Sequence, residues 1–185
     1  PHWNWEEKEG ENVPVFVYTN GDSAELLLNG ISQGFERKIV DSEKSVERYR
    51  LMWKEVVYQP GELKAVAYKN GEVLGEQIVR TAGEIAEIRL KPDRTVIQPG
   101  IRDLSYILIE AFDKDGNPVP LADNLVKFDV KGPGIIAGVG SGNPQSFASF
   151  QKPEVKLFYG KAMLIIEGGD KTGIINIKAS INGLK

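Results

Sequence analysis

A series of short apolar runs, separated by turn-forming residues, constrains the fold of this chain more than any other feature. The first two runs cover residues 15–20 and 25–28, and Asn20-Gly21-Asp22 lies between them. Asn29-Gly30 and Asn70-Gly71 are dipeptides that readily adopt the positive φ values of tight hairpin turns. We therefore predict that the first two runs form a β-hairpin across Asn20-Gly21-Asp22, closed by Asn29-Gly30.

The same pattern continues to the end of the chain, with a turn signal roughly every 8 to 12 residues. Strands are expected over residues 15–19, 24–28, 34–39, 49–57, 61–69 and 72–80, and again over 85–90, 104–113, 125–130, 135–139, 161–167 and 173–181. The polar interval 41–48 is long enough for one helical turn only. The pattern predicts an all-β fold made of two tandem immunoglobulin-like or fibronectin-like β-sandwich domains.

The most probable linker is Thr81-Ala82-Gly83-Glu84, because the strand pattern stops before it and restarts after it. A chain of 185 residues is long enough for one large domain or two of ordinary size. We therefore predict one β-sandwich over residues 1–82 and a second over residues 83–185.

The charge balance and the composition exclude several classes of protein. Residues 1–82 carry a net charge of −4 and residues 83–185 a net charge of +1, so neither half has the basic field of a nucleic-acid-binding protein. No apolar run approaches the roughly 20 residues that a membrane helix requires. The chain has no cysteine, which excludes disulfides and thiolate metal sites.

One acidic turn has part of the spacing of a calcium loop. Asp113, Asp115 and Asn117 stand at its first, third and fifth positions, but the sixth and twelfth positions hold Pro118 and Asn124 instead of glycine and glutamate. An ordinary turn rich in Asp and Gly explains these residues better. We predict no metal site.

The glycines around Gly132-Pro133-Gly134 and Gly142 could suggest a phosphate-binding loop. Such a loop must open a helix whose N-terminal amides face the anion, and no amphipathic helix follows here. We expect a turn or bulge at residues 132–134, an exposed loop at Gly142-Asn143-Pro144, and no cofactor-binding residue.

An ordered series of motifs resembles a known family. The segment from Val15 to Gly34 has the form V-x-V-Y-T-N-x-D-x-x-E-L-x-L-N-G-x-S-x-G. It resembles the module that follows the catalytic barrel in bacterial glycoside hydrolase family 2 enzymes of the β-galactosidase type. The resemblance extends to residues 1–5 and 53–68, and it resumes at Gly142-Asn143-Pro144 and residues 157–160, so it covers most of the chain.

The resemblance implies a non-catalytic C-terminal region of a retaining, β-galactosidase-like enzyme. The two catalytic glutamates of such an enzyme belong to its barrel, which needs on the order of 250 residues and does not fit in this chain. The chain also offers only one imidazole, His2, for a catalytic triad. We therefore expect no catalytic residue, and a structural role in packing against the barrel and in assembly.

The same resemblance implies further properties of the parent protein. Its barrel would be the main partner, the parent could form a homo-oligomer, and a periplasmic or secreted location is expected, with no leader among these residues. Two alternatives remain open for the chain itself. One is a carbohydrate-binding module that anchors the enzyme to a polysaccharide, and the other is an adhesin-like spacer.

Four aromatic residues are the candidates for contact with a sugar or with the barrel. They are Trp3, Trp5, Trp53 and Tyr58. Aromatic rings stack well on the apolar faces of pyranoses, but they also form the core of β-sandwiches. We interpret Trp53 and Tyr58 as core residues first, and Trp3 and Trp5 as residues that cap the core of the first module.

Overall fold

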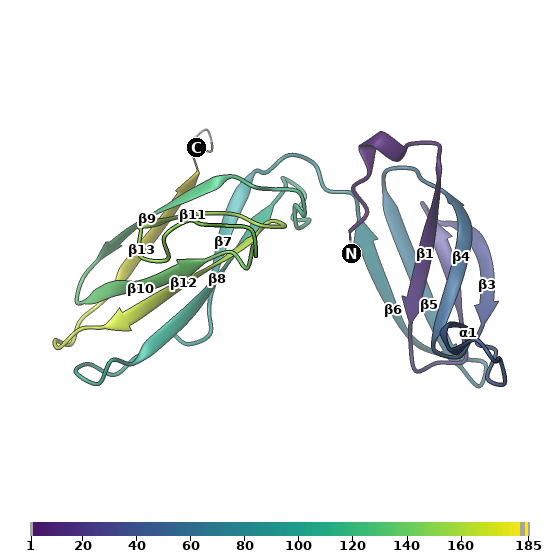
Figure 1. Cartoon of the computed structure of the whole chain (residues 1–185), viewed down its shortest axis with the longest axis horizontal. Helices are drawn as coiled ribbons and strands as arrows, with labels where there is room; N and C mark the ends of the chain where they lie inside the picture. Colours follow the sequence, from purple (N-terminus) through teal and green to yellow (C-terminus); the bar gives the residue numbers. More distant parts are fainter. Residues whose placement is uncertain (1, 182–183, 185) are drawn as a thin grey trace. The chain divides into compact units, whose positions relative to one another are not determined.

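A computed structural model describes residues 2–181 and 184 of the chain, which divides into two compact units over residues 1–81 and 82–185 (Figure 1). Almost all of the regular structure consists of antiparallel strands. Each unit packs two sheets around a core of its own. The predicted all-β fold with two β-sandwiches is confirmed.

The first unit contains a four-stranded sheet and a two-stranded sheet. Its elements are η1 (Glu6–Lys8), β1 (Asn12–Tyr18), β2 (Ser23–Leu28), β3 (Ile31–Arg37), α1 (Ser45–Tyr49), β4 (Arg50–Val57), β5 (Glu62–Lys69) and β6 (Glu72–Arg80). The strand order is β3-β2-β5-β6 in the larger sheet, whereas β1 pairs only with β4. Alternate apolar side chains of both sheets fill the core between them, as in other β-sandwiches.

The predicted hairpin between the first two runs is wrong. β1 pairs with β4, and both edges of β2 are occupied by β3 and β5, so β1 and β2 belong to different sheets. The segment between them crosses from one sheet to the other. Gly21 lies so close to β5 that a β-carbon there would overlap the carbonyl oxygen of Tyr68, and the Asp22 amide donates to that same oxygen over 2.8 Å.

Two other turns do form tight hairpins. Asn29-Gly30 joins β2 to β3, and Asn70-Gly71 joins β5 to β6. All four residues have positive φ values between 51° and 86°, which is the conformation that two-residue hairpin turns of this kind require. The single helical turn expected near residues 41–48 is the five-residue helix α1.

The second unit packs a four-stranded sheet on a three-stranded sheet. Its strands are β7 (Glu87–Pro92), β8 (Leu104–Phe112), β9 (Leu125–Lys131), β10 (Gly134–Gly140), β11 (Glu154–Lys156), β12 (Lys161–Gly168) and β13 (Asn176–Ile181). The strand orders are β10-β12-β8-β7 and β11-β9-β13. Residues 132–133 form the predicted turn, which carries the chain from β9 in one sheet to β10 in the other. The short strand β11 was not predicted.

The acidic turn after β8 is a hydrogen-bonded structure centred on Asp113. The Asp113 carboxylate, which is almost fully buried, accepts bonds from the backbone amides of Gly83, Asp115 and Asn117 and from the Asn117 side-chain amide, over 2.8 to 3.1 Å. Burial by itself raises the pKa of this carboxyl, but the hydrogen bonds outweigh it and lower the pKa to about 2. The turn therefore uses its carboxylate to bind backbone amides.

Two further structural findings concern the described residues. Residues 2–181 and 184 contain no group of three or more metal-ligating His, Asp or Glu side chains. Within the same residues, no helix is long and apolar enough to span a membrane.

Candidate functional site

Trp3 and Tyr58 form the end of the core of the first unit. Their ring centroids lie 4.9 Å apart, and both side chains are buried. The Trp3 indole donates to the Gln59 carbonyl over 3.0 Å, and the Tyr58 hydroxyl accepts from the Trp5 amide over 3.1 Å. Both rings are therefore covered on the chain itself and cannot stack on a sugar.

Trp53 occupies the centre of the same core. Its side chain is buried, and its indole nitrogen donates to the Gly34 carbonyl of β3 over 3.2 Å. Because β3 and β4 belong to different sheets, this bond ties the two sheets together. Trp53 is thus a core residue of the sandwich.

Trp5 is half-buried and differs from the other three candidates. Its ring stacks on His2, with centroids 4.6 Å apart and 26° between the planes. Burial lowers the pKa of His2, which favours the neutral form of this imidazole. Together the two rings cap the segment that leads into β1, which leaves only part of the Trp5 indole for contact with another molecule.

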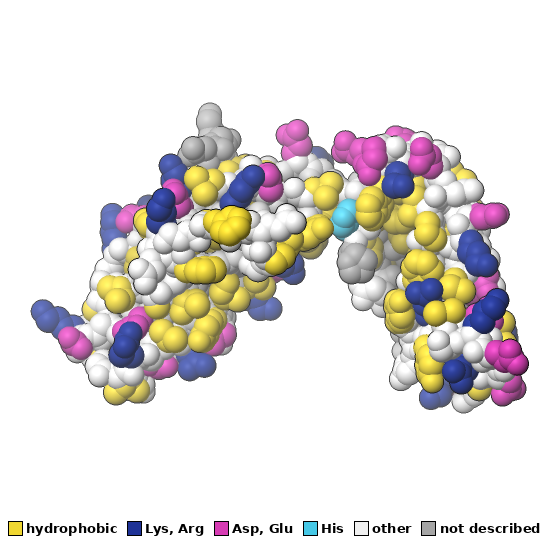
Figure 2. Space-filling view, viewed as in Figure 1, with side chains coloured by type: hydrophobic (Ala, Val, Ile, Leu, Met, Phe, Trp, Pro, Cys, Tyr) yellow, Lys and Arg dark blue, Asp and Glu magenta, His cyan; other side chains and the backbone are white. Residues whose placement is uncertain are grey.

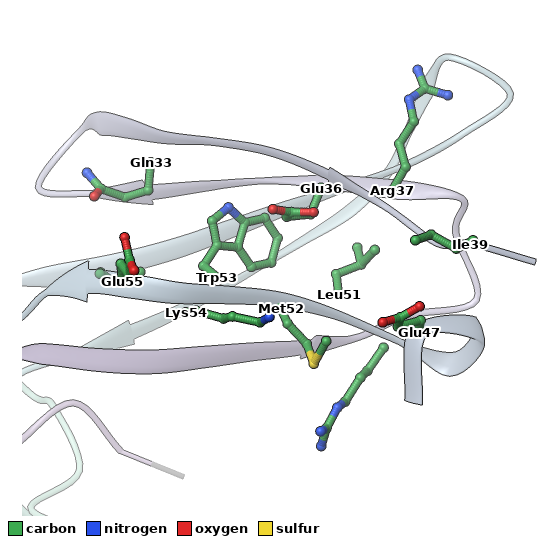
Figure 3. Close-up of a pocket in the computed structure, with 12 residues that line it drawn as sticks. Gln33, Glu36, Arg37, Ile39, Glu47, Leu51, Met52, Trp53, Lys54 and Glu55 are labelled. Atoms are coloured by element: carbon green, nitrogen blue, oxygen red, sulfur yellow. The ribbon is translucent and has the colours of Figure 1, made fainter. Parts of the chain in front are cut away.

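A groove of about 470 Å³ runs between the neighbouring edges of β3 and β4. Figure 3 shows the Trp53 indole pointing from β4 toward β3 with Glu36 beside it, while Gln33 and Glu55 lie at one end and Ile39 and Glu47 at the other. Charged and amide side chains thus surround a buried indole at the seam of the two sheets.

Glu47 in this groove does not have the chemistry of a glycosidase general acid. Such an acid needs a carboxyl whose pKa is raised. The pKa of Glu47 is instead lowered, first of all because its carboxylate accepts a 2.6 Å hydrogen bond from the Ser42 hydroxyl. We regard the groove as the seam of the sandwich.

The outer face of the sheet formed by β1 and β4 exposes aromatic side chains. Phe16 lies opposite Met52, and Tyr18 lies opposite Arg50, so all four side chains point away from the core. Phe16 is 44% exposed and Tyr18 is 70% exposed. Figure 2 shows hydrophobic side chains gathered over these two strands, with basic side chains among them.

Arg50 is the polar centre of this β1–β4 face, which we define by Phe16, Tyr18, Arg50 and Met52. Its guanidinium lies over the Phe16 ring at 4.4 Å and donates to the Tyr18 hydroxyl over 3.4 Å. Its Nε is buried and has no hydrogen-bond partner among the described residues. Aromatic residues and arginine are the side chains enriched at the centres of protein interfaces.

Sequence reasoning missed the β1–β4 face, although one signal was present. Residues 15–18 of β1 are Val, Phe, Val and Tyr, so both faces of this strand are apolar. A strand with a single covered face normally alternates between apolar and polar residues. A strand that is apolar on both faces is therefore expected to have its second face covered by another surface.

Comparisons with known proteins decide the family. Residues 88–185, which are more than half of the chain, match the family described as glycoside hydrolase family 2 C-terminal domain 5. The chain belongs to this family. Residues 10–75 match a second family, which is described only as a domain of unknown function, DUF4982.

Relatives of this family 2 C-terminal region extend the match to the whole chain. It is 40% identical, over all of its length, to the beta-galactosidase BoGH2A of Bacteroides ovatus, and 32% identical over 87% of its length to a putative beta-glucuronidase of Formosa agariphila. A glycosyl hydrolase family 2 member from Bacteroides cellulosilyticus superimposes on the whole chain with a TM-score of 0.91 and 38% identity. A beta-glycosidase from Bacteroides vulgatus does so with a TM-score of 0.89 and 29% identity.

The family 2 C-terminal region spans only part of each of these proteins. It covers 21% of the Bacteroides ovatus protein and 15% of the Formosa agariphila protein. Among the solved structures it covers 24% of the Bacteroides cellulosilyticus chain and 23% of the Bacteroides vulgatus chain. In these relatives most of the polypeptide lies outside the part that corresponds to this chain.

Proposed function

We propose that this chain is the non-catalytic accessory region of a longer, β-galactosidase-like family 2 glycosidase, and that its own role is to pack against the catalytic part. The family match and the 40% identity to a beta-galactosidase support the parent activity. In this account, hydrolysis with retention takes place in a barrel that lies outside these 185 residues.

The uncovered β1–β4 face is the observation that carries the packing role. A sheet of only two strands, with aromatic residues on its outer side, exposes apolar area that burial against a second surface would stabilise. The guanidinium of the half-buried Arg50 can donate hydrogen bonds to an acceptor group on that second surface. Residues 1–82 are acidic overall, yet this face carries Arg50, with Lys54 on the same strand, so the covering surface should contribute carboxylates or carbonyl oxygens.

The packing role is tested by Tyr18→Glu in the longer polypeptide, with Tyr159→Glu of the second unit as the matched control. The two tyrosines are similarly exposed, at 70% and 60%. A carboxylate at position 18 would lose its hydration when the face is covered and would repel the carboxylates or carbonyl oxygens expected on the covering surface. Tyr18→Glu should therefore lower the melting temperature and the β-galactosidase activity, whereas Tyr159→Glu should leave both unchanged.

The isolated 185-residue chain provides the second half of this test. Because Tyr18 is exposed on the isolated chain, neither variant should change its unfolding, and the wild-type chain should not hydrolyse p-nitrophenyl β-galactoside. Equal behaviour of the two variants in the longer polypeptide would contradict the packing role. Hydrolysis by the isolated chain would contradict the non-catalytic role.

A further inference from the structure

The loop between β10 and β11 of the second unit, whose course can be followed in Figure 1, carries two exposed aromatic residues. Phe147 is fully exposed, and Phe150 is 70% exposed. The C-terminal part of the loop is anchored to the strands, because the Val139 amide donates to the Phe150 carbonyl and the Phe128 amide donates to the Pro153 carbonyl, each over 2.8 Å. The Phe150 ring therefore stands on a fixed backbone.

The Phe150 ring lies beside β10 at a glycine. A β-carbon added at Gly140 would lie 3.7 Å from both Cδ1 and Cε1 of Phe150, so one side of the ring faces the strand at a position that has no side chain. The strand limits the movement of the ring on that side, and Phe150 as a whole is 70% exposed. A supported ring loses little conformational entropy when a ligand stacks on it.

A groove of about 280 Å³ adjoins this ring, and its wall combines apolar and neutral polar residues with Glu154 and Lys156. Phe150, Ser141, Asn143, Ser146 and Ser149 contribute to its wall. The hydroxyl oxygens of Ser146 and Ser149 accept bonds from the backbone amides of residues 148 and 151, and a hydroxyl that accepts such a bond still has its own hydrogen to donate. The volume lies near the lower end of the range of small-molecule sites, about 300 to 1,000 Å³.

The charge of this segment indicates the class of ligand. Charged residues make up 26% of the chain, yet residues 141–151 contain none and are rich in serine, asparagine and glutamine. A supported aromatic ring beside hydroxyl and amide groups matches a pyranose, which has an apolar face and a rim of hydroxyls. Glu154 and Lys156, which also line the groove, carry opposite charges and can hydrogen-bond to sugar hydroxyls.

We propose that the Phe150 groove, defined by Ser141, Asn143, Ser146, Ser149 and Phe150, binds one or two units of a neutral oligosaccharide. Phe150 is the stacking platform, and the hydroxyl and amide groups bind the rim of the sugar. This site lies in the second unit and is separate from the packing role proposed for the β1–β4 face, so either proposal can fail without the other.

Isothermal titration of the 185-residue chain with galactose, β-1,4-galactotriose and cellotriose tests this site. We expect saturable heat with a Kd of about 1 mM for at least one of these sugars. All three tryptophans lie in the first unit, so tryptophan fluorescence should not change on binding. Absence of saturable heat at about 20 mM of every sugar would overturn the proposal.

Matched variants locate the site. Phe150→Ala and Phe150→Leu should each weaken binding at least tenfold, and the leucine variant keeps an apolar contact with Gly140 in case the alanine variant disturbs the loop. Phe35→Ala removes a ring of similar exposure, 62%, from the first unit and should not change the Kd. Binding that survives both Phe150 substitutions, or that depends on Phe35, would place the sugar elsewhere and overturn the proposal.

Discussion

Asp113 shows how one residue holds the start of the second unit. One of its oxygens, Oδ1, accepts from the amides of Asp115 and Asn117, and the other, Oδ2, accepts from the Gly83 amide and the Asn117 side chain. These bonds connect the turn after β8 to the segment before β7. The acidic turn noted in the sequence is therefore a structural element of the second unit.

Replacing Asp113 with asparagine should destabilise the second unit by about 2 kcal/mol. The asparagine oxygen can keep the bonds of Oδ1, but its amide group then faces the two donors that Oδ2 accepted, Gly83 and Asn117. Asp115→Asn is the control, because that side chain is 64% exposed. Urea unfolding followed by circular dichroism measures both variants, and equal midpoints would contradict this role of Asp113.

The lowered pKa of Asp113 also predicts acid sensitivity of the second unit. The folded pKa of about 2 lies below the ordinary 3.8, so the contribution to stability is complete above about pH 4 and is lost as the pH falls toward 2. Unfolding midpoints measured between pH 5 and pH 2 should therefore fall more steeply for the wild type than for Asp113→Asn. Parallel curves would show that this carboxyl does not contribute to the acid sensitivity.

The sequence predicted the positions of individual strands and turns better than it predicted which strands pair. Alternation of apolar residues located nearly all strands, and the Asn-Gly dipeptides at 29–30 and 70–71 located two hairpins. The pairing of β1 could not be predicted, because its partners in β4 are 32 to 45 residues away and local turn chemistry does not report such a distant contact. Turn-forming residues at 20–22 were compatible with a hairpin and with a crossing between sheets.

Two glycines with nearly the same φ make it possible to distinguish the cost of a positive φ from the cost of steric overlap. Gly142 and Gly160 have φ values of 73° and 72°. A β-carbon at Gly142 meets no atom within 4 Å, whereas one at Gly160 would overlap the carbonyl oxygen of Val119. An alanine at either position therefore has about the same conformational penalty for its positive φ. Only at position 160 would its β-carbon also collide with backbone atoms.

We expect Gly142→Ala to lower the stability of the second unit by about 1 kcal/mol and Gly160→Ala to lower it by about 3 kcal/mol or more. The first value reflects an alanine held at positive φ. The second adds the displacement of the strand and loop that meet at Val119. Thermal unfolding of the two variants measures the difference, and equal melting temperatures would show that the second unit absorbs the collision without cost.

At the scale of the whole molecule, the two units have separate cores with no residue in common. The sequence predicted two sandwiches and the family, because both follow from patterns and motifs that are local in the chain. It did not predict which apolar side chains remain exposed. Trp3, Trp53 and Tyr58 are buried, in agreement with their first interpretation as core or core-capping residues rather than as contacts for a sugar. Phe16 and Tyr18 lie on the surface because β1 pairs with β4 alone.

The most direct test of the proposed packing role is to compare the solvent access of the β1–β4 face in the isolated chain and in the longer polypeptide. Hydroxyl-radical labelling, read by mass spectrometry, reports the exposure of Phe16, Tyr18 and Met52. We predict that labelling of these three residues falls severalfold in the longer polypeptide, while labelling of Val73, 64% exposed on β6, serves as the reference within the same unit. Equal labelling of the β1–β4 face in both proteins would show that the face stays open and would contradict the account.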